Sequence, residues 1–356
     1  MSRRHVRTTV GTAVAVAVMA VLAAGCGSSS SSSSSTSSGG APSSGTSASD
    51  AAATTTQSAA TSTKKFTIGI VSFASSEPTS TLALQGLMAV AKQNGWSASE
   101  IDPNGSESAA IAGMQDFVQK KVDVIITAVF PSKGLLAGAL AAKNAGIPVV
   151  SLSGGTGVGV QTQWDAGNLS GKLIVAKMMH DTGAKGALLA FEYNDGLPCV
   201  ERQAQLNAAL KAAHFSSVTP EQVPIPGQVT AGTSFASAWL AKHPSNGQPR
   251  AIWGCFDDPV VGAISAIKSA GQTGINTYGI DASVPALEDV LHGTMTATVF
   301  LNAYAGGEEL ARELPTAIAN GVNAAPKEFS LPAQLVDQQN IKAFLKDNPN
   351  VLKQTA

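Results

Sequence analysis

Residues 122–129 read Val-Asp-Val-Ile-Ile-Thr-Ala-Val, an apolar run rich in β-branched side chains. Such a run is typical of a strand buried on both faces, because the side chains that alternate across the strand are then equally apolar. Helical spacing precedes the run at 108–120 and follows it at 134–144. A buried strand between two helices predicts a parallel sheet with helices on both faces.

The same alternation of strands and helices extends in both directions along the chain. In the first half we expect strands at 66–71, 96–102, 122–129 and 147–152 and helices at 78–94, 108–120 and 134–144. After a break we expect strands at 187–193, 218–223, 251–256 and 277–280 and helices at 169–182, 200–214, 234–242 and 260–270. Two such sets predict an α/β protein with two doubly wound parallel-sheet lobes.

Ligands of open parallel sheets bind beyond the carboxyl ends of the strands, so the residues that end or follow the strands are candidates for a binding site. Several of these residues are polar or aromatic. They are Ser72, Phe73 and Ser153 in the first lobe and Tyr193, Phe256 and Asp257 in the second. Trp164, Tyr193 and Phe256 have an alternative interpretation as core aromatics.

Motifs of known catalytic sites are absent from the sequence. It contains no G-x-S-x-G elbow, no Walker sequence, no H-E-x-x-H and no C-x-x-C. The glycine-rich stretch 154–159 follows a strand but lacks the spacing of a nucleotide loop. Asp257 and Asp258 are adjacent acids with no third metal ligand near them in sequence. We therefore expect no enzyme activity, no metal and no cofactor, and an extracellular hydrolase is the least favoured class.

The N-terminus has the pattern of an export signal. Three arginines within the first seven residues precede an apolar stretch at 10–24, which is shorter than the roughly 20 residues of a membrane span. Residues 22–26, Leu-Ala-Ala-Gly-Cys, resemble the lipobox of bacterial lipoproteins, with Ala23 where the pattern prefers Leu. We expect residues 1–25 to be a lipoprotein signal peptide and Cys26 to be lipidated, with an ordinary signal peptide as the alternative. An Arg-Arg pair in this basic N-terminal segment also resembles a twin-arginine motif, so the sequence leaves open whether export uses the general or the twin-arginine route.

The segment after Cys26 is predicted to be a tether. Residues 27–63 are mostly Ser, Thr, Ala and Gly, with Asp50 as the one charged residue. Such a composition buries too little apolar surface to offset the entropy of ordering, so we expect 26–63 to be a lipidated cysteine and a disordered tether. Its root-mean-square span is roughly 30 to 36 Å. The expected location is the outer face of the cytoplasmic membrane.

The charge of the exported part argues against a nucleic-acid partner. Of the 23 basic residues, 20 remain after the three arginines of the signal are removed, against 24 acidic residues, a formal charge of −4. Nucleic-acid binding depends on a positively charged surface. We expect a monomer whose partners are a small solute and membrane proteins.

Cys199 and Cys255 are the remaining cysteines of the exported chain. An exported protein meets an oxidising compartment, where disulfides persist. Cys199 follows the first strand of the second lobe and Cys255 ends its third strand, and these strands are neighbours in a sheet of order 2-1-3-4. A bridge is therefore expected, with two free buried cysteines as the alternative.

Four stretches of the chain resemble the ribose-type periplasmic sugar-binding proteins. Residues 199–206, CVERQAQL, resemble the helix start in which an E-R pair follows the first strand of the second lobe. Residues 256–263, FDDPVVGA, resemble the family's N-D-x-x-A-x-G-A. Residues 278–281, YGID, resemble its G-x-D strand end, and 145–150, AGIPVV, its A-G-I-P-V-V strand. The resemblance extends from Lys65 to the C-terminus.

The resemblance implies a type I periplasmic-binding fold, in which two lobes joined by a hinge close on a solute and present it to the permease of an ABC importer. It implies chain crossovers near Trp164, Leu301 and Pro332. The N-terminal lobe would then comprise 64–165 plus 302–331, and the C-terminal lobe 166–301 plus 332–356. The same clamp could serve as a ligand sensor for a membrane receptor, which is the alternative function.

The resemblance also assigns ligand-binding residues. The family's arginine matches Arg202 and its aspartate matches Asp281, and both side-chain types suit a solute with several hydroxyls. Other positions depart from the family. Where the family has Asp-Arg this chain has Ser153-Gly154, and where the family has Asn this chain has Phe256. Thr79-Ser80 occupy the positions of the family's paired phenylalanines. The position of the family's glutamine late in the chain falls near Asn302. These departures leave the identity of the solute open.

Overall fold

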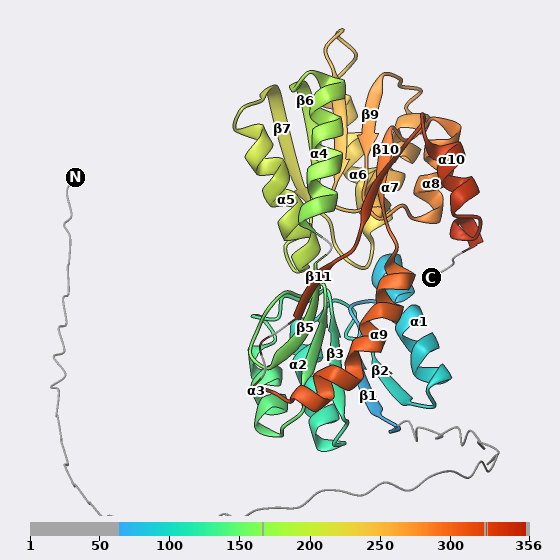
Figure 1. The fold of residues 1–356 in the computed structure, drawn as a ribbon. Helices are drawn as coiled ribbons and strands as arrows, with labels where there is room; N and C mark the ends of the chain where they lie inside the picture. The colour runs from blue at the N-terminus through green and yellow to red at the C-terminus, as the bar shows by residue number, and fades with distance from the viewer. Residues whose placement is uncertain (1–63, 166, 324, 326, 354–356) are drawn as a thin grey trace, which may run out of the picture. The chain divides into compact units, whose positions relative to one another are not determined.

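The computed structural model describes residues 64–165, 167–323, 325 and 327–353. The predicted signal peptide at 1–25 and the predicted lipidated Cys26 with its tether lie outside the described residues. Two six-stranded sheets organise the described chain, and Figure 1 shows one above the other. We call each sheet, with the helices packed on it, a lobe.

The sheet of the first lobe has the order β11-β5-β4-β3-β1-β2, and its paired strands are parallel. Its strands are β1 (Thr67–Val71), β2 (Ser97–Ile101), β3 (Val124–Ala128), β4 (Val149–Leu152), β5 (Val160–Asp165) and β11 (Lys327–Ser330). Its helices are α1 (Pro78–Gln93), α2 (Glu107–Gln119), α3 (Leu136–Asn144) and α9 (Ala303–Asn320). Every residue of β3 is buried, as its continuous apolar run predicts.

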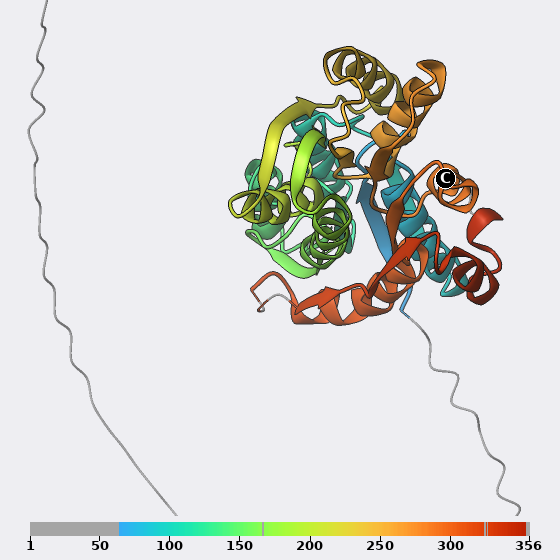
Figure 2. The same ribbon diagram turned by 90° about the horizontal axis from the view of Figure 1, so that it is seen from above.

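The sheet of the second lobe has the order β12-β10-β9-β8-β6-β7, with β12 antiparallel to β10. Its strands are β6 (Lys185–Glu192), β7 (His214–Gln222), β8 (Arg250–Gly254), β9 (Ile275–Tyr278), β10 (Ala297–Leu301) and β12 (Ala333–Asp337). Its helices are α4 (Asn168–Thr182), α5 (Leu197–Leu210), α6 (Gln228–Lys242), α7 (Asp257–Ser269), α8 (Val284–His292), α10 (Ile341–Asp347) and the short η1 (Val351–Lys353). Seen from above, α4 and α5 cover one face of this sheet and α6 and α7 the other (Figure 2). The predicted two-lobed α/β fold is confirmed.

The chain passes between the two sheets three times: between β5 and α4, between β10 and α9, and between β11 and β12. Helix α9 follows a strand of the second lobe but packs against α1 of the first. A Cβ on Gly307 would clash with the carbonyl of Ala83, and one on Gly86 with the carbonyl of Tyr304. The two helix backbones approach this closely because both contact positions lack a side chain.

Two predicted helices of the second lobe had wrong boundaries. Helix α5 begins at Leu197, because Pro198 is tolerated in a first helical turn, and it ends before His214, which begins β7. Helix α6 begins at Gln228, about two turns before the predicted start at 234. Its first turns contain β-branched residues and a glycine, which have low helix propensity, and packing against α7 decides their conformation.

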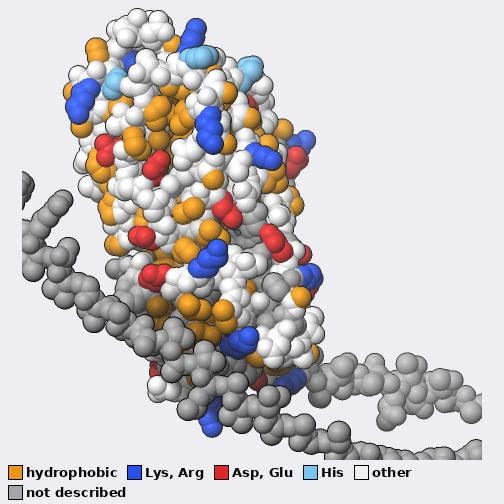
Figure 3. Space-filling model, turned by 90° about the vertical axis from the view of Figure 1, so that its left-hand side faces the viewer, with side chains coloured by type: hydrophobic (Ala, Val, Ile, Leu, Met, Phe, Trp, Pro, Cys, Tyr) orange, Lys and Arg blue, Asp and Glu red, His pale blue; other side chains and the backbone are white. Residues whose placement is uncertain are grey.

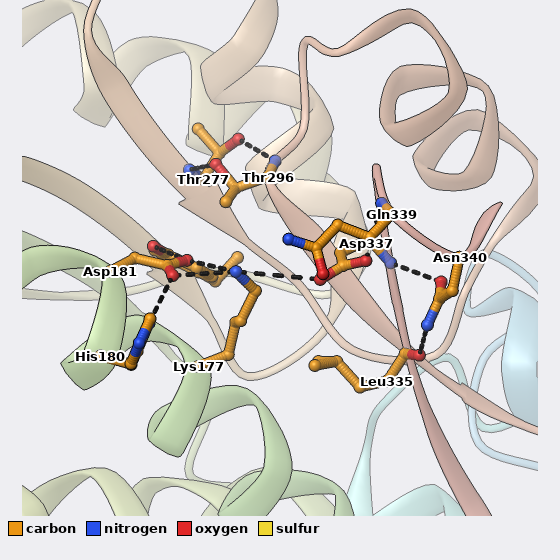
Figure 4. Close-up of polar contacts among 10 residues, drawn as sticks. Lys177, His180, Asp181, Thr277, Thr296, Leu335, Asp337, Gln339 and Asn340 are labelled. Carbon is orange, nitrogen blue, oxygen red and sulfur yellow. Dashed lines mark hydrogen bonds and ion pairs between the residues drawn. The ribbon is translucent and has the colours of Figure 1, made fainter.

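The C-terminal strand β12 is held to α4 by polar side chains (Figure 4). Lys177 Nζ lies 2.8 Å from a carboxylate oxygen of Asp181 and 3.8 Å from one of Asp337. Tyr278 Oη also donates to Asp181, at 3.0 Å. Burial alone would raise the pKa of Asp181, but hydrogen bonds from Lys177, His180 and Tyr278 outweigh it and lower that pKa. This cluster joins the last strand of the chain to the start of the second lobe.

Charged side chains of both signs are interspersed on the face that Figure 3 shows, with hydrophobic side chains between them. Within the described part of the chain, no helix combines the length and the apolar character that crossing a bilayer requires.

Candidate functional site

A cavity lies between the two lobes, where the carboxyl ends of their strands face each other. The first lobe contributes Phe73, Glu77, Thr79, Ser80, Val129 and Ser153, and the second contributes Tyr193, Cys199, Arg202, Ile225, Phe256 and Asp281. Its volume is about 50 Å³.

An ion pair forms the wall of this cavity on the second lobe. Nη2 of Arg202, in α5, donates to Oδ1 of Asp281 at 2.8 Å, and the two side chains are only 4% and 6% exposed. Nη1 of Arg202 also donates to the carbonyl of Cys255 at 2.7 Å. Both residues that the family resemblance assigns to ligand binding thus line the cavity, and the carbonyl of Cys255 helps to hold the guanidinium in place.

Cys199 and Cys255 form a disulfide in the structure, with their Cα atoms 5.1 Å apart. The bridge joins the first turn of α5 to the residue that follows β8. Arg202 lies on the same helix three residues after Cys199, and its Nη1 binds the carbonyl of Cys255. The bridge therefore connects the two segments between which Arg202 is positioned.

Glu77 forms part of the opposite wall, on the first lobe. It is 8% exposed and caps α1, because its carboxylate accepts hydrogen bonds from Thr79 N at 3.0 Å and Ser80 N at 2.8 Å. Burial raises the pKa of Glu77, and the charge of Asp281 across the cavity raises it further. Sequence reasoning missed this residue, although an acid directly before a proline that opens a helix is a recognisable capping signal.

Aromatic rings line another part of the cavity. The ring of Phe73 packs edge-on against Tyr193 of the second lobe, with centroids 5.9 Å apart, and against Phe130 at 4.8 Å. Burial, followed by the charge of Asp195, raises the pKa of Tyr193 to about 12, so its hydroxyl stays protonated at neutral pH. The predicted candidates Phe73, Tyr193 and Phe256 all lie here, and Phe256 is 4% exposed.

Backbone conformations that are rare for residues other than glycine occur around the cavity. Val129 has a φ of 67° and Ser153 a φ of 64°, directly after β3 and β4. Asp281, close after β9, has a φ of 107°. Each such residue costs on the order of 1–3 kcal/mol, and such strain is found preferentially at functional sites. The surrounding packing holds these strand ends in place at a cost in stability.

Three other predicted site residues have structural contacts instead of positions in the cavity wall. Ser72 donates to the carbonyl of Ile101 at 3.2 Å, and exposed Asn302 caps α9 by accepting from Ala305 N. Asp257 is 1% exposed and accepts from Ser283 N and Thr298 Oγ1, both at 2.7 Å. Side chains at a strand end also satisfy buried backbone groups and helix termini, and these three residues do so here. Trp164 lies in β5, and its side chain is outside the described residues.

In the ranges that the structure describes, no three His, Cys, Asp or Glu side chains are grouped so that they could hold a metal ion. The cavity is lined by a buried ion pair, by the helix-capping carboxylate of Glu77 opposite it, and by aromatic rings. Such groups can bind a solute by hydrogen bonds and by stacking.

The chain belongs to the periplasmic binding protein domain family, whose model matches residues 68–321. It is 24% identical over 286 residues to the ribose import binding protein RbsB of Bacillus subtilis (strain 168), an alignment that covers 78% of this chain and 88% of that protein. The fold matches an ABC sugar transporter subunit from Rhodobacter sphaeroides 2.4.1, with a TM-score of 0.70, 25% identity, and coverage of 77% of this chain and 99% of that one.

A second solved structure of this fold is an ABC transporter solute-binding protein from Agrobacterium vitis with bound allitol. It superimposes with a TM-score of 0.73 at 24% identity and covers 80% of this chain and 99% of its own. The predicted resemblance to periplasmic sugar-binding proteins is confirmed, and the family places the protein outside the cytoplasm.

Proposed function

We propose that this protein is the solute-binding component of an ABC importer and that it binds a sugar or polyol between its lobes for delivery to a permease. The observation that carries the proposal is the buried pair of Arg202 and Asp281 on the cavity wall. The names of its relatives agree with this class of solute, since one is a ribose import binding protein and another holds allitol.

The chemistry of the cavity suits a polyhydroxylated solute. A guanidinium donates hydrogen bonds and a carboxylate accepts them from neighbouring hydroxyls, so Arg202 and Asp281 together match an edge that carries several hydroxyls. Glu77 supplies a second acceptor on the opposite wall. The rings of Phe73, Tyr193 and Phe256 supply apolar faces for the C–H surface of a sugar ring.

Binding would use hinge motion of the two lobes. The three chain crossings support the lobe boundaries expected from the sequence, 64–165 plus 302–331 and 166–301 plus 332–356. A solute favours closure only through contacts that it makes better in the closed state. Because Glu77 and the Arg202–Asp281 pair lie on different lobes, a solute that binds both has this differential affinity.

The protein would be a monomer anchored by a lipid on Cys26 to the outer face of the cytoplasmic membrane. The lipobox-like stretch before Cys26 supports the anchor, and the serine-rich composition that follows supports a long tether. A tether of this kind lets the clamp meet a permease in the same membrane.

A thermal-shift screen against sugars, polyols, amino acids and nucleosides tests the proposed class of solute. A solute at 100 times its Kd should add about 2.7 kcal/mol to the free energy of unfolding. We expect sugars or polyols to give the shift, followed by titration calorimetry of each hit. A shift given by amino acids or nucleosides alone would contradict the proposal.

A further inference from the structure

Gln228 joins the two lobes at a point outside the cavity wall. It is the first residue of α6 in the second lobe and is 5% exposed. Its Nε2 donates to the carbonyl of Ser76 in the first lobe at 2.6 Å and to Oδ2 of Asp258 in the second at 2.9 Å. Both partners are acceptors, so the orientation of the amide is determined by its contacts.

The amide oxygen of Gln228, Oε1, is buried and has no hydrogen-bond partner among the residues that the structure describes. Separation of the lobes would break the hydrogen bond from Nε2 to Ser76. The amide therefore favours the closed arrangement through this one bond.

The second lobe holds Gln228 in a fixed position. A Cβ on Gly232 would clash with the carbonyl of Pro259, and one on Gly262 with the carbonyl of Val229. Helices α6 and α7 are thus in close backbone contact next to Gln228, with Asp258 in the first turn of α7. A side chain positioned by such packing loses little further entropy when it binds across the lobes.

The acceptor on the first lobe is next to a residue of the cavity wall. Ser76 directly precedes Glu77, whose carboxylate caps α1 and faces the cavity. The bond from Gln228 therefore fixes the backbone beside Glu77 relative to the second lobe, which carries Arg202 and Asp281. The position of one wall relative to the other depends on this bond.

We propose that Gln228 is a latch: a positioning residue that stabilises the closed arrangement of the lobes through Ser76 without touching the solute. The effect on solute binding rests on the proposed function, whereas the effect on lobe separation does not. Loss of one neutral hydrogen bond shifts the equilibrium toward the open form by about 2-fold to 12-fold.

The test compares Gln228→Leu, which keeps the volume and removes both donors, with Thr233→Val on the same helix. Thr233 Oγ1 bonds to the carbonyls of Val229 and Gly262 within the second lobe, so this control loses hydrogen bonds of α6 but none between the lobes. Spin labels at exposed Lys92 and Lys211 report the distance between the lobes by electron double resonance, without any solute.

We expect Gln228→Leu to increase the population with longer distances and Thr233→Val to leave the wild-type distribution unchanged. With a solute from the screen, Gln228→Leu should raise the dissociation rate about 2-fold to 12-fold without lowering the association rate. The shorter Gln228→Asn serves the same test if the leucine variant does not fold. Wild-type distances in Gln228→Leu or Gln228→Asn, or an equal shift in Thr233→Val, would overturn the latch. A distance shift in a protein that binds no sugar would overturn the proposed function alone.

Discussion

Arg202 and Asp281 form a buried ion pair, with Nη2 of the arginine 2.8 Å from Oδ1 of the aspartate. The arginine also donates to the carbonyl of Cys255, so both Asp281 and Cys255 fix the position of its guanidinium group. Removal of one member of a buried pair leaves the other charge without its partner, which typically costs about 3–5 kcal/mol. The pair therefore affects both solute affinity and stability, and experiments must measure the two separately.

Asp281→Asn removes the charge of the carboxylate and keeps its shape. We expect solute affinity to fall by about 10-fold to 150-fold, the effect of losing a charged hydrogen bond. Arg202→Ala should weaken binding by at least as much and should also lower the free energy of unfolding. Titration calorimetry measures the affinity, and urea unfolding measures the stability.

Lys268→Met is the matched control for this pair. Lys268 lies 3.2 Å from Asp289 in the same lobe, but its side chain is 57% exposed. Loss of such a surface pair should cost less than about 1 kcal/mol and leave affinity unchanged. If calorimetry gave wild-type affinity for both Arg202→Ala and Asp281→Asn, these two residues would not be the solute contacts.

The disulfide is the subject of a second prediction. Replacing both cysteines, Cys199→Ala with Cys255→Ala, should lower the free energy of unfolding by about 2–5 kcal/mol, because the unfolded chain regains the entropy of the open loop. Solute affinity should also fall, since the bridge joins the segments that position Arg202. Mass spectrometry of the alkylated, unreduced wild-type protein checks the bridge itself, and two alkylated thiols would show that it does not form.

A third prediction concerns pH and Asp258. Burial raises the pKa of the Asp258 carboxyl above its ordinary value of 3.8, the hydrogen bond from Gln228 partly opposes the rise, and the charge of Asp281 adds to it. The folded state thus binds the proton more tightly than the unfolded state. The contribution of Asp258 to stability is fully present below the unfolded pKa and is lost as the pH rises through the folded pKa.

Asp258→Asn, which is neutral at every pH, should therefore be more stable than the wild type near neutral pH, and this difference should shrink toward pH 3.8. Urea unfolding across this range measures it, with Asp116→Asn as the control because Asp116 is 46% exposed in a surface pair. A stability difference that grew as the pH fell would have the wrong sign and would refute the assignment.

The fourth prediction tests the lipid anchor. Cys26→Ala should release the protein from membranes while the solute-binding part keeps its affinity, because the lipid would be attached to Cys26 and the cavity lies far along the chain. Fractionation of cells followed by calorimetry of the soluble protein measures both. Membrane association equal to that of the wild type would refute the anchor.

Sequence alone determined the two-lobed α/β architecture, because buried parallel strands such as 124–128 require continuous apolar runs between helical patterns. Arg202 and Asp281 could be proposed from the motifs around them, since the family resemblance covers both positions. The same reasoning had no signal for where helix α6 begins. Its first turn is selected by contact with α7 and not by its own residues.

Tertiary structure alone decided which strand-end residues face the cavity. Asp257 and Ser72 follow strands just as Phe256 and Phe73 do, yet the first two satisfy buried backbone and hydroxyl groups while the latter two line the cavity. Gln228 depends on a contact between residues far apart in sequence, since its partner Ser76 is 152 positions away. A sequence pattern indicates which residues of a single helix or strand are buried. A contact between two lobes depends instead on how the folded sheets pack against each other.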